Sequence, residues 1–290
     1  MRLDSDDQPG FGDMTLNLAE QGARLLGATL HRQSVVGGGS LSDVVEIELS
    51  DGQTAIVKGG PAPSVEAEML DAIRATGAPV PAVLAKDDAV LVLERLPTRG
   101  QIDDAWHDLG AVLAQLHGAA PESEAHDRPH RYGWQTDYGF GKVGIANAWT
   151  DNWPAFWAER RLANQTPHLP KDIASRVERL AGQLADYLPA KPPPALLHGD
   201  LWGGNILVAD GGISGLIDPA CYYGDREVDF AMLQLFSRPG RQLFAVCDSL
   251  EPGHEARLPI YQLWPALVHF RLFGSGYREM VERMLSLADV

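Results

Sequence analysis

The spacing of apolar residues changes from a helical to a strand period within the first hundred positions. Apolar side chains recur at helical spacing over residues 14–30, which predicts an amphipathic helix. Two β-rich runs follow, joined through glycines, and a turn at Asp51-Gly52 precedes a third run, TAIVK. Because such turns between short apolar runs are typical of hairpins, we predict a three-stranded meander.

A second helix is predicted over residues 64–76, where apolar positions share one face and a glycine and a proline end the pattern. The segment AVLAKDDAVLVLERL then indicates two more short strands. An antiparallel sheet with one helix inserted after its third strand therefore occupies residues 31–97.

Beyond this sheet the pattern becomes mainly helical. Helices are predicted over 101–119, 153–163, 172–187, 226–237 and 259–285. Two apolar runs also enclose a polar, glycine-containing kink within 196–208, which indicates a loop held between buried strands. Strands first and helices second predict an α+β protein with two lobes. We divide the chain into a loose tail (1–13), an N-lobe (14–97) and a C-lobe (98–290).

Composition narrows the setting of this fold. The formal net charge of −15 would repel nucleic-acid phosphates, so we expect no nucleic-acid partner. Cys221 and Cys247 are the two cysteines, which fits a reducing compartment better than a disulfide scaffold. The acidic first residues lack the apolar core of a signal peptide, and no apolar run reaches membrane-spanning length. We therefore expect a cytoplasmic protein without a membrane partner.

The polar kink at 198–205 carries the clearest chemical pattern. His198, Asp200 and Asn205 are followed thirteen residues later by Asp218. This spacing matches the phosphoryl-transfer loop of protein kinases, in which an aspartate accepts the acceptor's proton and an asparagine and a second aspartate hold Mg²⁺. Oxygen ligands of these types suit Mg²⁺. The alternative is a polar turn with no chemical role.

Weaker patterns precede this loop in the order that a kinase requires. Glycines lie between two predicted strands, and Lys58 ends the run TAIVK, from which a cation reaches nucleotide phosphates. Glu66 or Glu68 on the next helix is the predicted partner of Lys58. Backbone groups at the end of the apolar strand 91–96 are predicted to hydrogen-bond an adenine. Each feature alone is as typical of a turn or a solvated surface, and only their order favours a kinase.

The sequence resembles the fructosamine kinase (ketosamine-3-kinase) family, in the aminoglycoside-phosphotransferase-like branch of the protein-kinase fold. The resemblance rests on motifs that cover nearly the whole chain, above all HGDLWGGN and DPACYYGDREVD. It implies a two-lobed protein-kinase-like fold with ATP and Mg²⁺ as cofactors. Asp200 is the implied base and Asn205 and Asp218 the metal ligands. The implied nucleotide-binding residues are Gly37, Gly38, Gly39, Ser40, Lys58, Glu66, Glu94 and Leu96.

Aromatic and basic residues close to these motifs are candidates for acceptor binding, with packing within the lobe as the alternative. They are Trp202, Tyr222, Tyr223 and Arg226. His198 and Asp229 are predicted to brace the loop, and a structural role is favoured for His117. The chain departs from the family pattern at Tyr138, Val268 and Arg271, which leaves the identity of the acceptor open.

The resemblance implies an ATP-dependent kinase that phosphorylates the sugar 3-hydroxyl of ketosamines, either small molecules or glycated lysine side chains, in deglycation repair. The residues themselves support only phosphoryl transfer to a hydroxyl. A kinase for an aminoglycoside or an amino alcohol, a nucleotide-binding pseudokinase and a metal hydrolase built on His198 and Asp200 are the alternatives. We expect a monomer.

Overall fold

The computed structural model describes residues 11–36, 43–60, 62–118, 132–246 and 250–289. They divide into two compact units. The first unit contains the described residues up to Glu68, together with Pro81–Leu96, and the second contains Met69–Val80 and the described residues from Pro97 onward. Each unit is considered by itself below.

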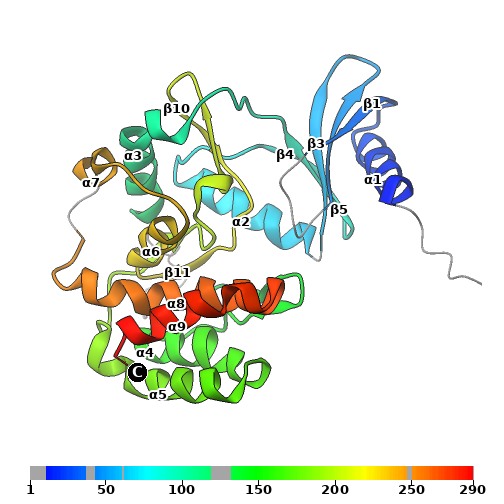
Figure 1. Ribbon diagram of the computed structural model, residues 1–290. Coiled ribbons are helices and arrows are strands. Elements are labelled where there is room, and N and C mark those ends of the chain that lie inside the picture. The colour runs from blue at the N-terminus through cyan, green and yellow to red at the C-terminus, as the bar shows by residue number, and fades with distance from the viewer. Residues whose placement is uncertain (1–10, 37–42, 61, 119–131, 247–249, 290) are drawn as a thin grey trace, which may run out of the picture. The chain divides into compact units, whose positions relative to one another are not determined.

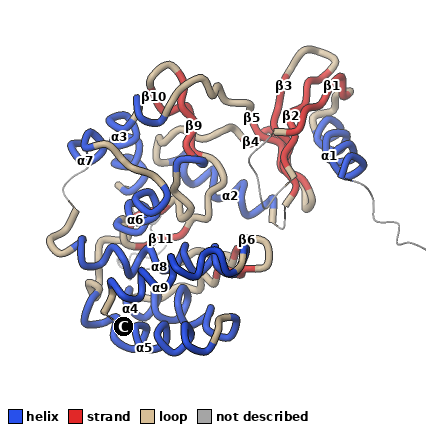
Figure 2. Tube along the Cα trace, in the orientation of Figure 1, coloured by secondary structure: helices blue, strands red, loops and turns tan. Residues whose placement is uncertain are grey.

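The first unit is a five-stranded antiparallel sheet flanked by one helix (Figure 1, Figure 2). The strands follow the order β1-β2-β3-β5-β4, so β4, the first strand after the inserted helix, lies at an edge of the sheet. The elements are α1 (Phe11–Leu25), β1 (Leu30–Val35), β2 (Val44–Leu49), β3 (Thr54–Gly59), β4 (Val83–Lys86) and β5 (Val90–Glu94), with α2 (Pro63–Ala75) continuing into the second unit.

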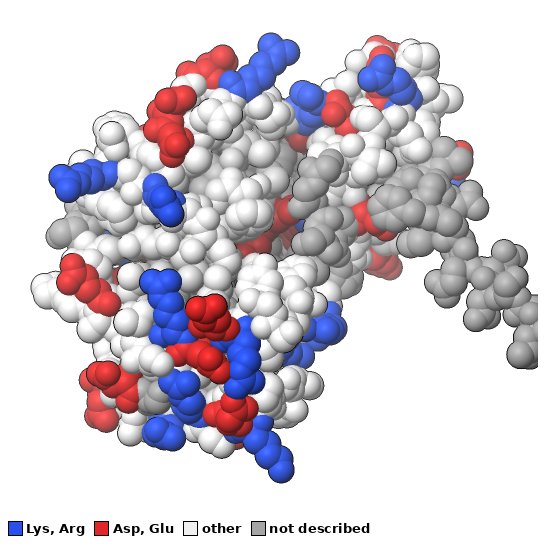
Figure 3. Space-filling view, in the orientation of Figure 1, with Lys and Arg blue, Asp and Glu red and all other residues white. Residues whose placement is uncertain are grey.

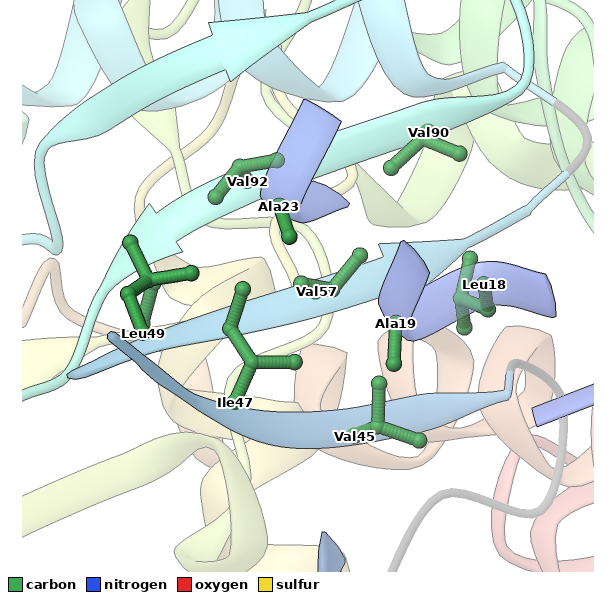
Figure 4. Close-up of a cluster of buried hydrophobic side chains, with 10 residues drawn as sticks. Leu18, Ala19, Ala23, Val45, Ile47, Leu49, Val57, Val90 and Val92 are labelled. Atoms are coloured by element: carbon green, nitrogen blue, oxygen red, sulfur yellow. The ribbon is translucent and has the colours of Figure 1, made fainter. Parts of the chain in front are cut away.

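Burial of alternate strand positions against α1 forms the core of this unit (Figure 4). On β2 the residues Val45, Ile47 and Leu49 are buried while their neighbours are partly exposed, as expected for a sheet with one covered face. Helix α1 approaches β3 so closely that a Cβ on Gly22 would lie 2.4 Å from a methyl group of Val57. The glycine therefore permits the packing of α1 on the sheet.

The predicted meander, inserted helix and two further strands are confirmed, with differences at the N-terminus. The first helix begins at Phe11 and ends at Leu25, whereas the pattern predicted 14–30. Residues 11–13, predicted as part of a loose tail, are therefore helical, and residues 1–10 lie outside the described residues. Gly27 takes a φ of 68°, which allows the chain to leave the helix before β1 begins.

The second unit is mainly helical, with short two-stranded pairs (Figure 2). Its elements are η1 (Ile102–Asp104), α3 (Trp106–His117), β6 (Tyr138–Phe140), β7 (Val143–Ile145), α4 (Trp153–Phe156), η2 (Trp157–Leu162), η3 (Ala163–His168), α5 (Lys171–Tyr187), β8 (Ala195–Leu197), η4 (Gly203–Asn205), β9 (Ile206–Ala209), β10 (Gly212–Leu216), β11 (Tyr222–Gly224), α6 (Glu227–Phe236), α7 (Arg241–Val246), α8 (His254–Phe273), η5 (Ser275–Tyr277) and α9 (Arg278–Leu287). No helix within the described ranges combines the length and apolarity needed to cross a membrane.

Two strand pairs fix the ends of the polar kink, as its flanking apolar runs predict. Strand β8 precedes the kink and pairs with β11, while β9 follows it and pairs with β10. Leu196, Leu197, Ile206 and Val208 are buried. The sequence pattern did not predict β11, which brings Tyr222 opposite Leu197.

The helix predicted over 259–285 is instead two helices, α8 and α9. Gly274 separates them with φ 85° and ψ −158°, a backbone conformation that is essentially restricted to glycine. Arg278 at the start of α9 then forms ion pairs with Asp172 of α5 and with Glu282. Figure 3 shows basic and acidic side chains intermingled over this helical region.

Replacement of Gly274 isolates the effect of this backbone conformation, since a Cβ there would meet nothing within 4 Å. We expect Gly274→Ala to lower the free energy of unfolding by about 1–3 kcal/mol. Gly276→Ala is the matched control, because its Cβ also enters open space and its φ is not positive. Urea unfolding of both variants checks this, and equal stabilities would contradict it.

Candidate active site

The loop between β8 and η4 is held by the carboxylate of Asp229 on α6. Asp229 is fully buried, and its two oxygens accept hydrogen bonds from the backbone amides of His198 (2.9 Å) and Gly199 (3.0 Å). Its Oδ2 also lies 2.9 Å from Nε2 of His117. Burial alone would raise the pKa of Asp229, but the hydrogen bond and charge of His117 leave that pKa below its usual range. The predicted role of Asp229 in holding the loop is therefore confirmed, and His117 contributes by hydrogen-bonding the Asp229 carboxylate.

The imidazole ring of His198 also stabilises this loop, through hydrogen bonds with backbone groups. Its side chain is fully buried, with Nε2 3.0 Å from the carbonyl oxygen of Ile217, and Nδ1 accepts a hydrogen bond from the Asp200 amide at 3.3 Å. An accepting Nδ1 requires the neutral tautomer that donates from Nε2. Burial lowers the pKa of His198, which favours that neutral form.

Asp200 and Asn205 lie side by side. The amide nitrogen of Asn205 donates to the Asp200 backbone oxygen (2.8 Å) and to its carboxylate Oδ2 (3.0 Å). This orientation turns the amide oxygen of Asn205 away from Asp200. The Ile217 amide donates to the Asn205 backbone oxygen at 3.0 Å, which brings Asp218 beside Asn205. Asparagine and aspartate oxygens are ligands that suit Mg²⁺, and the assignment of Asn205 and Asp218 as its ligands stays a prediction.

Backbone strain is concentrated around these residues. Asp218 has a φ of 54°, which is uncommon for a residue with a side chain and recurs at functional sites. Gly199 has a φ of 79°, and a Cβ there would lie 2.1 Å from the Ala220 carbonyl oxygen. Only glycine fits at position 199, so the central residue of HGD is sterically required.

The alternative of a metal hydrolase needs a cluster of ligands around His198 and Asp200. Among the described residues, no group of three or more His, Cys, Asp or Glu side chains is arranged to hold a metal ion. Asn205 with Asp218 is a smaller set, which suits a cation that also binds phosphate oxygens.

The first unit contains a buried ion pair. Lys58 Nζ on β3 lies 2.8 Å from Oε1 of Glu66 on α2, and their side chains are 9% and 6% exposed. The predicted pairing of Lys58 is confirmed, with Glu66 and not Glu68 as the carboxylate in this contact. A buried ion pair is weak evidence for stability, and the contact of Lys58 with nucleotide phosphates stays a prediction.

The other residues predicted to bind the nucleotide lie at the end of β5 and in the segment 37–40. The Glu94 amide donates to the Ala82 carbonyl oxygen at 2.8 Å, so sheet pairing uses this donor, and the contact of Glu94 with adenine stays a prediction. Leu96 lies just beyond β5, and its contact with adenine stays a prediction. Gly37, Gly38, Gly39 and Ser40 lie outside the described residues.

Comparison with known proteins identifies the family. The sequence profile of the fructosamine kinase family matches residues 17–288. A protein of Synechocystis sp. named a probable ketoamine kinase is 37% identical over 207 residues, 67% of this chain and 66% of that protein, just under two thirds of its length. A solved candidate fructosamine-3-kinase from Thermobifida fusca has a TM-score of 0.82 at 31% identity, with 93% of this chain and 98% of that chain covered. The chain belongs to the fructosamine kinase family.

The predicted protein-kinase-like α+β fold is also confirmed. A solved aminoglycoside phosphotransferase in a ternary complex with ADP and hygromycin B has a TM-score of 0.64 at 14% identity, with 94% of this chain and 97% of that chain covered. At this identity the similarity establishes the fold alone. Family membership indicates a kinase, and the residues described above supply groups of the types that phosphoryl transfer uses.

The predicted acceptor residues lie in different surroundings. Trp202 is 39% exposed at the surface of the loop. Tyr222 is buried, with the Arg161 guanidinium 4.1 Å from its ring centroid, so packing within the unit accounts for this residue. Tyr223 stacks on Trp134 at 6.1 Å and on Trp149 at 6.0 Å between ring centroids. Arg226 immediately precedes α6.

Sequence reasoning missed two residues that shape this region. Ser237 ends α6 and its hydroxyl accepts a hydrogen bond from the Gly203 amide at 3.1 Å. Arg161 is fully buried and donates to the Ala146 carbonyl and to Oδ1 of Asn147. A serine after a helix is too common to indicate this contact, whereas an arginine within the aromatic segment WPAFWAERR is a usable signal.

The three departures from the family pattern have separate settings in this fold. Tyr138 begins β6, and Val268 is buried in α8. Arg271 donates to Oε1 of Gln165 in η3. The effect of these residues on acceptor choice stays a prediction.

A buried acidic network lies at the start of α6. Asp225 accepts hydrogen bonds from the Tyr261 hydroxyl (2.8 Å) and from the Glu227 amide (3.0 Å). Glu227 is itself paired with Arg257 through two hydrogen bonds of 2.8 and 2.6 Å. Burial, followed by the charge of Glu227, raises the pKa of Asp225 to about 6.

This shift predicts a pH-dependent effect of Asp225→Asn. Because the folded-state pKa exceeds the ordinary 3.8, Asp225 stabilises the fold below pH 4 and loses that contribution as the pH rises through about 6. The free energy of unfolding of Asp225→Asn, relative to that of wild type, should therefore increase by about 3 kcal/mol between pH 4 and pH 8. Urea unfolding across this range measures the difference, and parallel pH profiles would contradict the prediction.

Proposed function

We propose that this protein transfers the γ-phosphoryl group of ATP to the sugar 3-hydroxyl of ketosamines. The observation that carries the proposal is the pairing of Asp200 and Asn205 in a loop whose backbone is fixed by buried Asp229. Membership in the fructosamine kinase family supports the ketosamine class. Phosphorylation of such sugar–amine adducts would serve deglycation repair.

Each residue has a defined role in this proposal. Asp200 orients the acceptor hydroxyl and accepts its proton as the new O–P bond forms and the bond to ADP breaks. Asn205 and Asp218 hold Mg²⁺, which when bound neutralises charge on the phosphates. Lys58, fixed by Glu66, contacts the α- and β-phosphates. The first unit thus contributes to nucleotide binding, and the second contributes the base, the metal ligands and the acceptor residues.

Three residues of the second unit are the proposed acceptor contacts. Trp202 is exposed on the loop that carries Asp200, Tyr223 lies on the strand paired with β8, and Arg226 follows it closely. An aromatic face suits both the C–H surface of a sugar and an amine cation. Ketosamines on free amines and on protein lysines both carry this chemistry, and we propose a cytoplasmic monomer that accepts either.

Turnover of a defined acceptor panel tests the proposal. We expect ADP release with ATP, Mg²⁺ and ribulosyl- or fructosyl-lysine analogues, and ³¹P–¹H correlation should locate the phosphate on the 3-position. Kanamycin and choline represent the aminoglycoside and amino-alcohol alternatives. Faster turnover of either one would replace the ketosamine assignment, and absence of turnover with every acceptor would favour a pseudokinase.

Replacement of Asp200 tests the proposed base. Asp200→Asn is nearly isosteric, so melting temperature and ATP affinity should stay close to wild type while kcat falls by about 10²–10⁴-fold. The matched control is Asp210→Asn, the same change at an exposed position in the β9–β10 turn. Calorimetry, ATP titration and kcat from one preparation separate the two interpretations. Near-normal turnover by a folded Asp200→Asn protein would exclude this mechanism.

A further inference from the structure

The indole of Trp202 lies against the backbone of Gly204. A Cβ built on Gly204 would lie 2.3, 2.5 and 2.7 Å from Cη2, Cζ2 and Cζ3 of the indole ring. These separations are too short for any side chain, so the ring occupies the volume that a side chain at position 204 would fill. Its exposed fraction of 39% leaves part of the indole open to solvent.

The turn that carries this indole is tied to the end of α6. The Gly203 amide donates to Ser237 Oγ at 3.1 Å, and the Ser237 amide donates to the Leu233 carbonyl oxygen at 2.8 Å. Ser237 is thus fixed by the last turn of the helix. The backbone amide of Asn205 also donates to the Trp202 carbonyl oxygen at 2.9 Å. This bond closes a turn that runs from Trp202 to Asn205, a proposed metal ligand.

We propose that Gly204 and Ser237 are positioning residues that hold the Trp202 indole on the loop as one wall of the acceptor site. This inference rests on the proposed function, since it assigns the indole to the acceptor. The ligand class is a sugar–amine adduct, whose C–H face and ammonium group both favour an aromatic surface. Neither residue is assigned a contact with the nucleotide.

The geometry at Gly204 allows a substitution that moves the Trp202 indole without disturbing the fold of the loop. Gly204 has no positive φ, so its backbone accepts alanine without strain. The atoms in its way are the far end of a side chain with two rotatable bonds, which can swing off the loop. Gly204→Ala therefore displaces the indole while the backbone of the loop stays as it is.

Kinetics of Gly204→Ala give the first test. We expect the acceptor KM to rise ~10-fold, which corresponds to loss of one aromatic contact, with the ATP KM within about twofold of wild type. Ser237→Ala should raise the acceptor KM in the same direction by a smaller factor. Gly182→Ala is the control, because a Cβ there meets nothing within 4 Å in the middle of α5. An unchanged acceptor KM in Gly204→Ala would overturn the inference.

A double-mutant cycle distinguishes positioning from a general structural effect. In a Trp202→Ala background, Gly204→Ala should have no further effect on the acceptor KM, because the indole it displaces is already absent. Equal effects of Gly204→Ala in both backgrounds would overturn the inference. So would an unchanged acceptor KM in Trp202→Ala, while ketosamine turnover itself would still support the proposed kinase.

A readout without turnover keeps the two failures apart. The seven tryptophans can be labelled with 5-fluorotryptophan, and the ¹⁹F resonance of Trp202 is the one that disappears in Trp202→Ala. We expect this resonance to shift in Gly204→Ala and not in Gly182→Ala, and to shift on addition of a ketosamine in wild type. An unmoved resonance in Gly204→Ala overturns the inference even if no ketosamine is phosphorylated.

Discussion

The hydrogen bonds of one buried carboxylate organise the loop that carries the proposed base, Asp200. Asp229 has no exposure to solvent, and a charge in that position is stable only when donors surround it. Two consecutive loop amides and an imidazole supply those donors. The second anchor, Ser237, lies eight residues later, just past the end of the same helix and about 12 Å along its axis. Asp229 of helix α6 and Ser237 at its end therefore hold the loop from His198 to Gly203 in place.

Lys58 and Arg161, the buried lysine and arginine within the described part of the chain, are stabilised in different ways. Lys58 has a carboxylate partner in Glu66, so its charge is balanced locally. Arg161 is surrounded by a carbonyl group, an asparagine oxygen and the rings of Phe156, Tyr222 and Trp264. Such contacts solvate a guanidinium through dipoles and π-electrons. They connect the segment around Asn147 to β11, and so stabilise the strand that pairs with β8.

Much of this arrangement could be predicted because it depends on local patterns. The meander follows from glycine turns between apolar runs, and the Lys58–Glu66 pair follows from a strand end and the helix after it. The loop between β8 and β9 follows from two apolar runs around a polar kink.

Features that depend on distant residues could not be predicted in this way. The guanidinium group over the ring of buried Tyr222 comes from Arg161, sixty-one positions earlier. The hydrogen bond from Gly203 requires the end of a helix thirty-four residues later. The break at Gly274 was visible as a glycine, but its backbone angles were not, since a glycine within a helical pattern is also tolerated. The hydrogen bond from the Glu94 amide to Ala82 could not be predicted, because the pattern gave no register for the strand beside it.

The support given by α6 has a thermodynamic consequence for ligand recognition. A loop whose amides end on a buried carboxylate acquires its shape when the unit folds, and opens only with the packing around that carboxylate. Ordering entropy for these residues is then part of the folding free energy and is not subtracted from the affinity for a substrate. Preorganisation of Asp200 and Asn205 is therefore inherited from the hydrophobic packing of α6, so substitutions in that packing can change turnover without touching any ligand.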